Sequence, residues 1–124
     1  CFSNKEDSEY MWKEYANNHK GYCLKYDIQK LYENNYFAIP VFYSDKQVDV
    51  NKQLDAIFFL KYNKYNMESE WRHIDYWDKT NPKGCLKKII LPEEIICGKA
   101  IDKECLQVLK EICNEKGTIR FSIK

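Results

Sequence analysis

The chain of 124 residues is long enough to bury a hydrophobic core, and its 44% hydrophobic content is typical of a globular protein. Its 20 basic and 19 acidic residues give a formal net charge of +1, and only two of the basic residues are arginines, so we expect no nucleic-acid partner. The longest apolar run, Ala56 to Leu60, is too short to cross a membrane, and no secretory signal is visible, so we expect no membrane partner.

Six cysteines stand at positions 1, 23, 85, 97, 105 and 113, without any Cys-x-x-Cys pair. Mostly apolar neighbours favour reduced, buried thiols over the alternatives of disulfide bonds or a metal site. Reduced thiols are typical of cytoplasmic proteins, so we expect a cytoplasmic location and no metal. Because the sequence begins with Cys1 and not with Met, an upstream segment that has been removed and a processed, lipid-modified end both stay open.

The first predicted elements are a strand end and a helix. Residues 1–3 resemble the end of a strand, and Asp7 or Ser8 can cap a helix that runs to about Asn18 and stops at Gly21. Its apolar residues fall at helical spacing: Met11, Trp12, Tyr15 and Ala16.

Short strands and helices then alternate. We predict strands over 21–26 and 36–43, with a helix over 28–35 between them, and Pro40 indicates an edge strand or a bulge. Helical spacing of apolar residues predicts a further helix over 48–62.

Two-residue alternation predicts a long strand over 67–77, and composition predicts a turn over 78–84. Two more strands, over 85–91 and 93–97, are separated at Pro92.

The last helix is capped by Asp102 and ended by Gly117, and a strand over 118–123 follows. Its apolar stripe consists of Leu106, Leu109, Ile112 and Cys113. Together these elements predict an α+β fold with a mixed, mostly antiparallel sheet and three to four helices, in a single domain over 1–124.

Glu68, Glu70 and Arg72 are the first candidates for chemistry. Residues two apart in a strand point to the same face, so all three would lie together. Two neighbouring carboxylates raise the pKa of one of them unless a cation intervenes, and Arg72 is placed to be that cation. Such a group suits a general base, or a carboxylate that holds a ribose hydroxyl and stabilises positive charge. The alternative is the solvated face of an amphipathic strand, with Trp71 packed inward.

His19 is the second candidate, at the end of the first predicted helix. It can act as a proton shuttle or contact a substrate oxygen, or it can be a helix-end cation. Trp12, Tyr15 and Trp71 can form an aromatic wall for a base or sugar ring, with core packing as the alternative. For His73 we expect packing.

These segments, in this order, resemble the bacterial domain-of-unknown-function 2971 family. Its members carry a Cys-Phe-Ser strand, matched by 1–3, and a Met-Trp-x-x-Tyr-Ala-Asp/Asn-x-His-x-Gly helix, matched by Met11 through Gly21. A later stretch runs from a Lys through an aromatic residue to Glu-x-Glu-aromatic-Arg, matched by Lys61, Tyr65 and 68–72. The resemblance covers nearly the whole chain and implies no established activity.

Family members usually have a further half upstream, so the resemblance implies that 1–124 is the C-terminal portion of a longer domain. Without that half, a strand edge or an apolar face would need cover from a homo-oligomer or from another protein partner.

The strand order is also similar to one class of ADP-ribosyltransferases, which have an arginine strand, a strand ending in Ser and a Glu-x-Glu strand. That similarity implies NAD as the cofactor, with Ser3 on the nicotinamide side and Glu70 as the catalytic carboxylate. Glu68 and Arg72 would assist, His19 would line the pocket, and the arginine of the first strand would lie upstream. The implied function is an NAD-using effector in conflict or defence. The alternatives are a non-enzymatic protein-interaction module and a structural half that completes another chain's sheet.

Overall fold

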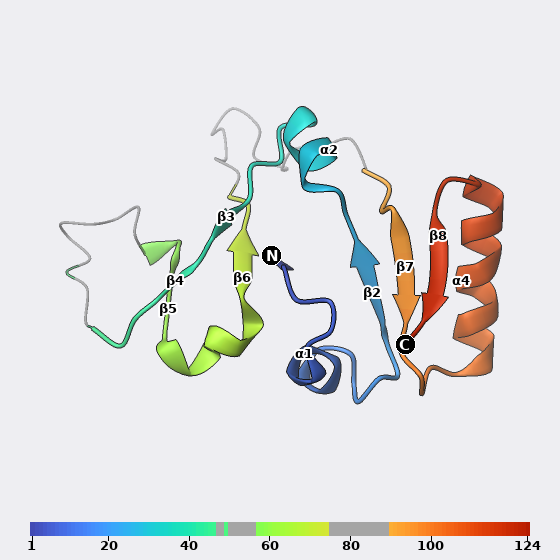
Figure 1. The fold of residues 1–124 in the computed structure, drawn as a ribbon, viewed down its shortest axis with the longest axis horizontal. Helices are drawn as coiled ribbons and strands as arrows, with labels where there is room; N and C mark the ends of the chain where they lie inside the picture. The colour runs from blue at the N-terminus through green and yellow to red at the C-terminus, as the bar shows by residue number, and fades with distance from the viewer. Residues whose placement is uncertain (47–48, 50–56, 75–89) are drawn as a thin grey trace, which may run out of the picture. The chain divides into compact units, whose positions relative to one another are not determined.

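The computed structural model describes residues 1–46, 49, 57–74 and 90–124. The chain divides into two compact units, and each of them is built from two separate segments. The first unit consists of Cys1–Lys5 and Asn35–Lys88, and the second of Glu6–Asn34 and Ile89–Lys124. Helices and short, mostly antiparallel strands occur together, which confirms the α+β fold class (Figure 1). None of the helices in these ranges is long and apolar enough to cross a membrane.

The sheet of the second unit has the order β2-β7-β8, with bounds Tyr22–Lys25, Glu94–Cys97 and Arg120–Ile123. β2 is antiparallel to β7, whereas β7 and β8 are parallel and are connected by the helix α4, Lys103–Lys116. A parallel pair needs such a crossover, and α4 packs on both strands (Figure 1). The core cluster between helix and sheet consists of Ile95, Cys97, Leu109, Cys113 and Ile119.

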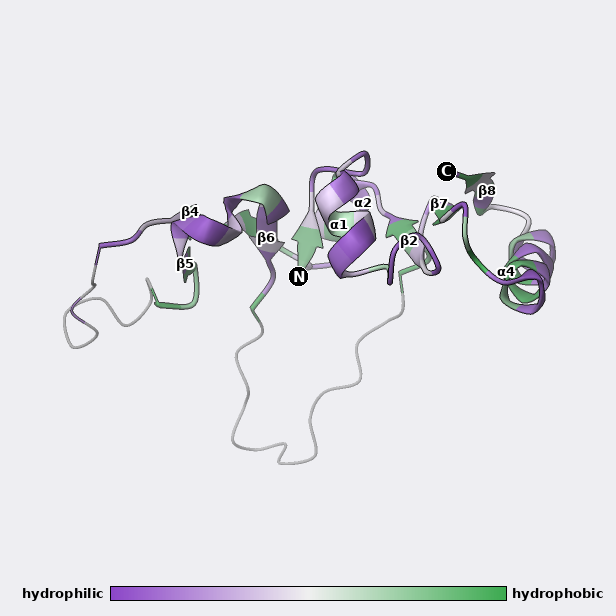
Figure 2. Ribbon diagram, turned by 90° about the horizontal axis from the view of Figure 1, so that it is seen from below, coloured by the Kyte–Doolittle hydropathy of each residue, from purple (hydrophilic) through white to green (hydrophobic). Residues whose placement is uncertain are grey.

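The ends of α4 lie where the sequence predicts them. The Asp102 side chain accepts a hydrogen bond from the Cys105 N–H at 2.9 Å, and Gly117 adopts a left-handed conformation with φ of 65°. The helix carries both hydrophobic and hydrophilic residues (Figure 2), and Leu109 and Cys113 are its buried side chains. Both terminal signals are local in sequence, which is why the prediction succeeds here.

Replacing Asp102 with alanine should lower the free energy of unfolding by about 1 kcal/mol, because the Cys105 N–H loses its side-chain partner. Urea unfolding followed by circular dichroism measures this loss. Asp102→Asn retains an acceptor oxygen and is the matched control, so an equal loss in both variants would contradict the capping explanation.

The first helix, α1 (Glu9–Glu14), begins as predicted, since the Ser8 hydroxyl accepts the Met11 N–H at 3.3 Å. It ends well before the predicted Asn18. Asn17, Asn18 and His19 have φ values of 47°, 54° and 64°, so the chain turns in left-handed conformations instead of continuing the helix. Asparagine and histidine tolerate this region better than most residues.

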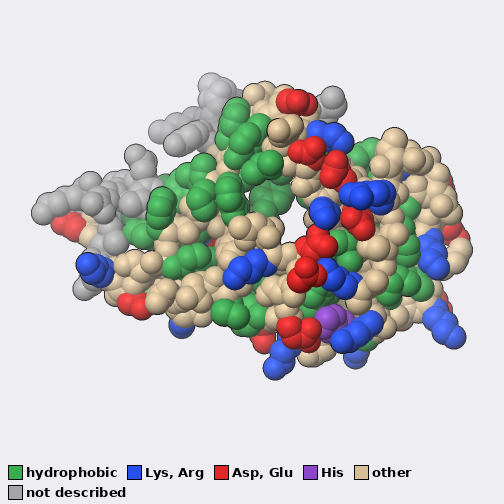
Figure 3. Space-filling view, in the orientation of Figure 1, with side chains coloured by type: hydrophobic (Ala, Val, Ile, Leu, Met, Phe, Trp, Pro, Cys, Tyr) green, Lys and Arg blue, Asp and Glu red, His purple; other side chains and the backbone are tan. Residues whose placement is uncertain are grey.

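In the second unit, Glu6 forms ion pairs at both edges of the sheet. Its carboxylate bonds the Lys25 ammonium at 2.7 Å and the Lys124 ammonium at 3.2 Å, which lie in and next to the two edge strands β2 and β8. Figure 3 shows acidic and basic side chains beside one another on the visible face. The helix α2 (Ile28–Glu33) follows β2 as predicted, capped by the Asp27 side chain, which accepts the Gln29 N–H at 2.8 Å.

The first unit contains two small sheets. One has the order β1-β6-β3, all antiparallel, with bounds Phe2–Ser3, Glu70–Arg72 and Ile39–Pro40. The other pairs β4 (Phe42–Tyr43) with β5 (Leu60–Lys61) in parallel. The predicted strand over 36–43 is thus two short strands. β3 lies at the edge of its sheet, which confirms the edge strand predicted from Pro40.

Four further predicted elements differ from the structure or fall outside the described residues. Residues 63–68 form a 3₁₀ helix, η1 (Asn63–Glu68), so the predicted strand over 67–77 is wrong at its start. The strand is β6 and ends at Arg72, residues 73–74 are in no strand, and residues 75–77 lie outside the described residues. The predicted helix over 48–62 is wrong at its end, where β5 lies, and most of its length is outside the described residues. The predicted turn over 78–84 and residues 85–89 of the next strand are also outside them, and 90–91 are not in a strand.

Candidate functional site

A local turn brings Glu68 and Glu70 to the same place. Glu68 ends η1, and Ser69 has a left-handed backbone with φ of 45° before β6 begins at Glu70. The predicted reason for the convergence, one continuous strand, is therefore wrong for Glu68. Both side chains are nevertheless buried, with exposed fractions of 4% for Glu68 and 6% for Glu70, so the alternative of a solvated strand face is also wrong.

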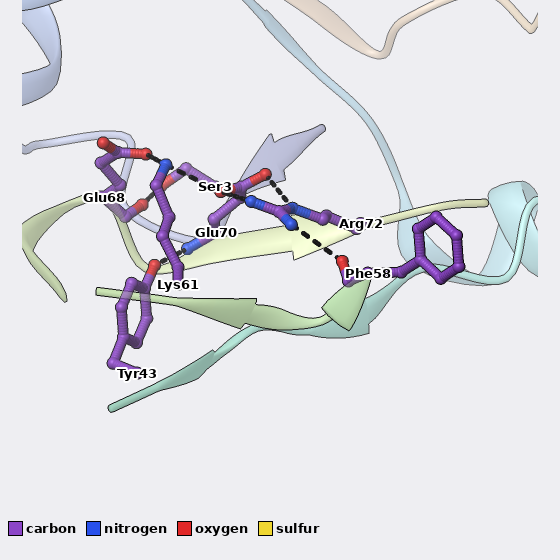
Figure 4. Close-up of polar contacts among 7 residues, drawn as sticks. All are labelled: Ser3, Tyr43, Phe58, Lys61, Glu68, Glu70 and Arg72. Carbon is purple, nitrogen blue, oxygen red and sulfur yellow. Dashed lines mark hydrogen bonds and ion pairs between the residues drawn. The ribbon is translucent and has the colours of Figure 1, made fainter. Parts of the chain in front are cut away.

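Lys61 joins the two carboxylates. Its ammonium donates hydrogen bonds to Oε2 of Glu68 and, at 3.0 Å, to Oε2 of Glu70 (Figure 4). The spacing in the sequence predicts Arg72 as the cation between the two carboxylates, and this is wrong: the shared cation is Lys61, from β5. We call Lys61, Glu68, Glu70 and Arg72 the charged cluster.

Arg72 binds one carboxylate of the cluster in two places. Its Nε donates to Oε1 of Glu70 at 2.7 Å and its Nη2 to Oε2 at 3.0 Å, while Nη1 donates to the Phe58 carbonyl at 2.8 Å. The two residues are two apart in β6 and share a face, as predicted. This fork-shaped pairing fixes the orientation of the Glu70 side chain.

The backbone of Glu70 is held as firmly as its side chain. Its N–H donates to the Tyr43 hydroxyl at 2.8 Å, and its carbonyl accepts the Val41 N–H at 2.9 Å. Ser3 pairs with Glu70 across β1 and β6, and its hydroxyl donates to the Glu68 carbonyl at 2.7 Å (Figure 4). Ser3 therefore lies beside the charged cluster, and its side chain binds the backbone of Glu68.

The hydrogen bonds between cations and carboxylates change the pKa values of Glu70 and Lys61. The hydrogen bond from Arg72 and that from Lys61 outweigh the effect of burial and lower the pKa of Glu70 to about 2. Burial alone would lower the pKa of Lys61, but the hydrogen bonds to Glu68 and Glu70 raise it above its ordinary value. Glu70 is thus ionised at neutral pH and is only a weak general base there, because the most effective bases have a pKa near the working pH.

The low pKa of Glu70 predicts a loss of stability in acid. A carboxyl whose pKa falls from 4.5 to about 2 on folding stabilises the native state above pH 4.5, and this stabilisation disappears as the pH falls toward 2. We expect a loss on the order of 3 kcal/mol across that window. Urea unfolding at several pH values measures it, and Glu70→Gln should show a flatter dependence. Parallel curves for the two proteins would contradict the assignment.

The second unit contains the candidate residue His19. His19 is 8% exposed and stacks on Trp12, with ring centroids 5.4 Å apart and the planes within 5°. Its Nε2 lies 3.0 Å from the Glu9 carboxylate, and this hydrogen bond lowers the pKa of Glu9. Among the described residues, Nδ1 of His19 has no partner. His19 thus packs inside the unit after the end of α1.

The remaining aromatic candidates divide between the units. Trp12 is 5% exposed and donates from Nε1 to the Glu6 carbonyl at 3.0 Å, whereas Tyr15 is 63% exposed. Trp71 lies in β6 of the first unit. Their binding of substrate stays a prediction. His73 packs as expected, with Nδ1 at 3.2 Å from the Phe37 carbonyl and its ring against Tyr36.

The cysteines follow the sequence prediction in part. The five described ones are free thiols, of which Cys97 and Cys113 are buried and Cys1 and Cys105 are exposed; Cys85 is outside the described residues. Burial raises the pKa of Cys97 and Cys113, which keeps them as unreactive thiols.

Sequence reasoning missed two residues of the site, Lys61 and Tyr43. Lys61 belongs to the motif that carried the family resemblance, so its position there was the available signal. Tyr43 offered none, because its hydroxyl meets the Glu70 N–H only through the folded arrangement of β4 and β6.

Comparison with protein families places both sets of candidate residues in one matched region. Residues 11–80, which include the Trp12–His19 segment and the whole charged cluster, match the family described as protein of unknown function, DUF2971. The chain belongs to this family. Comparisons with curated proteins and with solved structures gave no match. Membership of the DUF2971 family therefore identifies the domain but does not specify an activity.

Proposed function

We propose that the charged cluster is the centre of an NAD-using site of the ADP-ribosyltransferase type. The observation that carries this proposal is a buried carboxylate, Glu70, whose pKa of about 2 keeps it ionised, paired across two strands with Ser3. A strand serine, Ser3, paired with Glu70 of the Glu-x-Glu segment agrees with the order that the fold-level similarity implies, although only Glu70 of the two glutamates lies in the strand.

The proposed reaction needs a fixed negative charge more than it needs a base. The bond between C1′ of the ribose and the nicotinamide nitrogen breaks, and nicotinamide leaves with the bonding electron pair. The positive charge that develops on the ribose is stabilised by a carboxylate already in place. A nucleophilic group of the acceptor then bonds to C1′ and releases its proton to the solvent. Glu70 suits the electrostatic part of this reaction because it does not titrate near neutral pH.

Calorimetric titration of the full-length protein with NAD, together with an assay of released nicotinamide, tests the proposal. We expect binding and release by the wild type and slower release by Glu70→Gln at a temperature where circular dichroism shows a folded protein. Glu104→Gln, on the exposed side of α4, is the matched control and should behave as the wild type. A folded wild-type protein that neither binds NAD nor releases nicotinamide would end the proposal.

A non-enzymatic interaction module is the second candidate, and it is favoured by exposed apolar side chains of the first unit. Phe42, Phe58, Tyr62 and Met67 have exposed fractions of 64%, 52%, 66% and 51%. Exposed apolar side chains that form one patch are typical of surfaces that meet another chain. Light scattering during size-exclusion chromatography, compared between the wild type and Phe42→Ser, tests whether that chain is a second copy; identical masses as monomers would exclude a homo-oligomer.

For the NAD-using function we propose a role as an effector in conflict or defence, and for both candidates a bacterial cytoplasmic setting. The free thiols support a reducing compartment. Fractionation of cells that produce the full-length protein tests the location.

A further inference from the structure

Glu68 and Glu70 differ in how many of their carboxylate oxygens are already used. Both oxygens of Glu70 accept hydrogen bonds, Oε1 from Arg72 and Oε2 from Arg72 and Lys61. Of the two Glu68 oxygens, Oε2 accepts from Lys61, and no contact within the described residues uses Oε1 (Figure 4). The two carboxylates therefore have different capacities for a further partner.

Burial gives this difference a consequence. Glu68 is 4% exposed, so its carboxylate has exchanged most of its contact with water for the contact with Lys61. A carboxylate oxygen in such surroundings gains strongly from a hydrogen-bond donor, and bonds to charged groups are the stronger ones. Figure 4 shows the second oxygen of Glu68 on the side away from Lys61, whereas the Glu70 carboxylate lies between Lys61 and Arg72.

The remaining contacts hold Glu68 where it can receive a donor. The Ser3 hydroxyl bonds its carbonyl at 2.7 Å, and the Ser69 N–H bonds the Asn66 carbonyl at 3.2 Å, which fixes the backbone on both sides. The hydrogen bond from Lys61 also fixes the carboxylate of Glu68. Glu68 is thus preorganised, which limits the ordering cost of binding.

We propose that Glu68, through Oε1, is the carboxylate of the cluster that contacts substrate, by accepting a hydrogen bond from a ribose hydroxyl. Glu70 is then a positioning residue: it fixes Lys61 and Arg72 and supplies fixed charge, without touching the substrate. This reverses the order of importance that the sequence suggested. The assignment rests on the proposed NAD-using function, because that function supplies the hydroxyl donor.

A comparison of Glu68→Gln and Glu70→Gln separates the two roles. We expect Glu68→Gln to melt close to the wild type, because the amide oxygen of glutamine can still accept from Lys61. The amide nitrogen then takes the place of Oε1 and cannot accept a hydrogen bond, so NAD should bind about ten- to hundredfold more weakly. Glu70→Gln should melt well below the wild type and release nicotinamide slowly, with an NAD dissociation constant within about threefold of the wild-type value. Glu104→Gln is the control for a glutamate outside the cluster, and Glu68→Asp should recover part of the lost affinity.

The outcomes distinguish this inference from the proposed function. If the wild type binds NAD and Glu68→Gln binds it equally well, the assignment of Glu68 is wrong and the proposed function survives. A wild type that does not bind NAD overturns both. Equal melting temperatures for the two glutamine variants would overturn the positioning role of Glu70, whether or not NAD binds.

Discussion

Glu70→Ala should lower the free energy of unfolding by about 3 kcal/mol or more, the largest effect that we expect within the first unit. The substitution removes the carboxylate that Arg72 binds and one of the two carboxylates that Lys61 binds. The side chains of Arg72 and Lys61 are only 24% and 20% exposed. Cations left in such surroundings without a carboxylate cost several kcal/mol, because they have lost water without compensation. Urea unfolding of the wild type and the variant measures the loss.

A double-mutant cycle with Arg72→Ala shows whether the pairing is the cause. Because the two side chains share two hydrogen bonds, the double variant should lose less stability than the two single variants added together. Glu104→Ala, on α4, controls for removing a glutamate outside the cluster. Additive losses within the cycle would mean that Glu70 stabilises the unit through packing or backbone contacts instead.

Gly98→Ala should be the most damaging single change in the second unit, with a loss on the order of 3 kcal/mol. A Cβ at position 98 would lie 2.2 Å from the His19 carbonyl oxygen and 2.8 Å from its Cα, both backbone atoms. That backbone cannot easily move away, since the His19 carbonyl accepts the Ala100 N–H at 3.0 Å and the Gly98 N–H donates to Gly21 at 2.9 Å.

Gly117→Ala is the matched control for Gly98→Ala. Position 117 has open space around it but a φ of 65°, so alanine there should cost only about 1 kcal/mol through its backbone conformation. Thermal and urea unfolding compare the two variants. If Gly98→Ala is no worse than Gly117→Ala, the close approach of His19 is not a real constraint on this position.

The sequence predicts best those features whose interactions are local. Ser8 and Asp102 cap their helices through hydrogen bonds that reach three residues along the chain, and Gly117 ends α4 by its own conformation. These signals can be recognised without knowing the fold.

Features decided by an unusual backbone or by distant contacts were predicted poorly. The end of α1 depends on three successive left-handed residues that no hydrophobic spacing indicates. In the cluster, the pairing of Glu70 with Arg72 follows from their spacing in β6, but the place of Lys61 depends on η1 and on the turn at Ser69. The alternation over 68–72 resembles that of a longer strand. The 3₁₀ helix followed by the left-handed Ser69 still brings the carboxylates of Glu68 and Glu70 together, as a strand would.

Ser3 and Glu68 are 65 positions apart, and β2 pairs with β7 across a comparable stretch of sequence. Partners this remote must find each other by diffusion of a long loop, which slows the search for native contacts. Neither unit can complete its sheets on a nascent chain until both of its segments have been synthesised. The strands made first therefore have unpaired edges during translation, and we expect slow refolding.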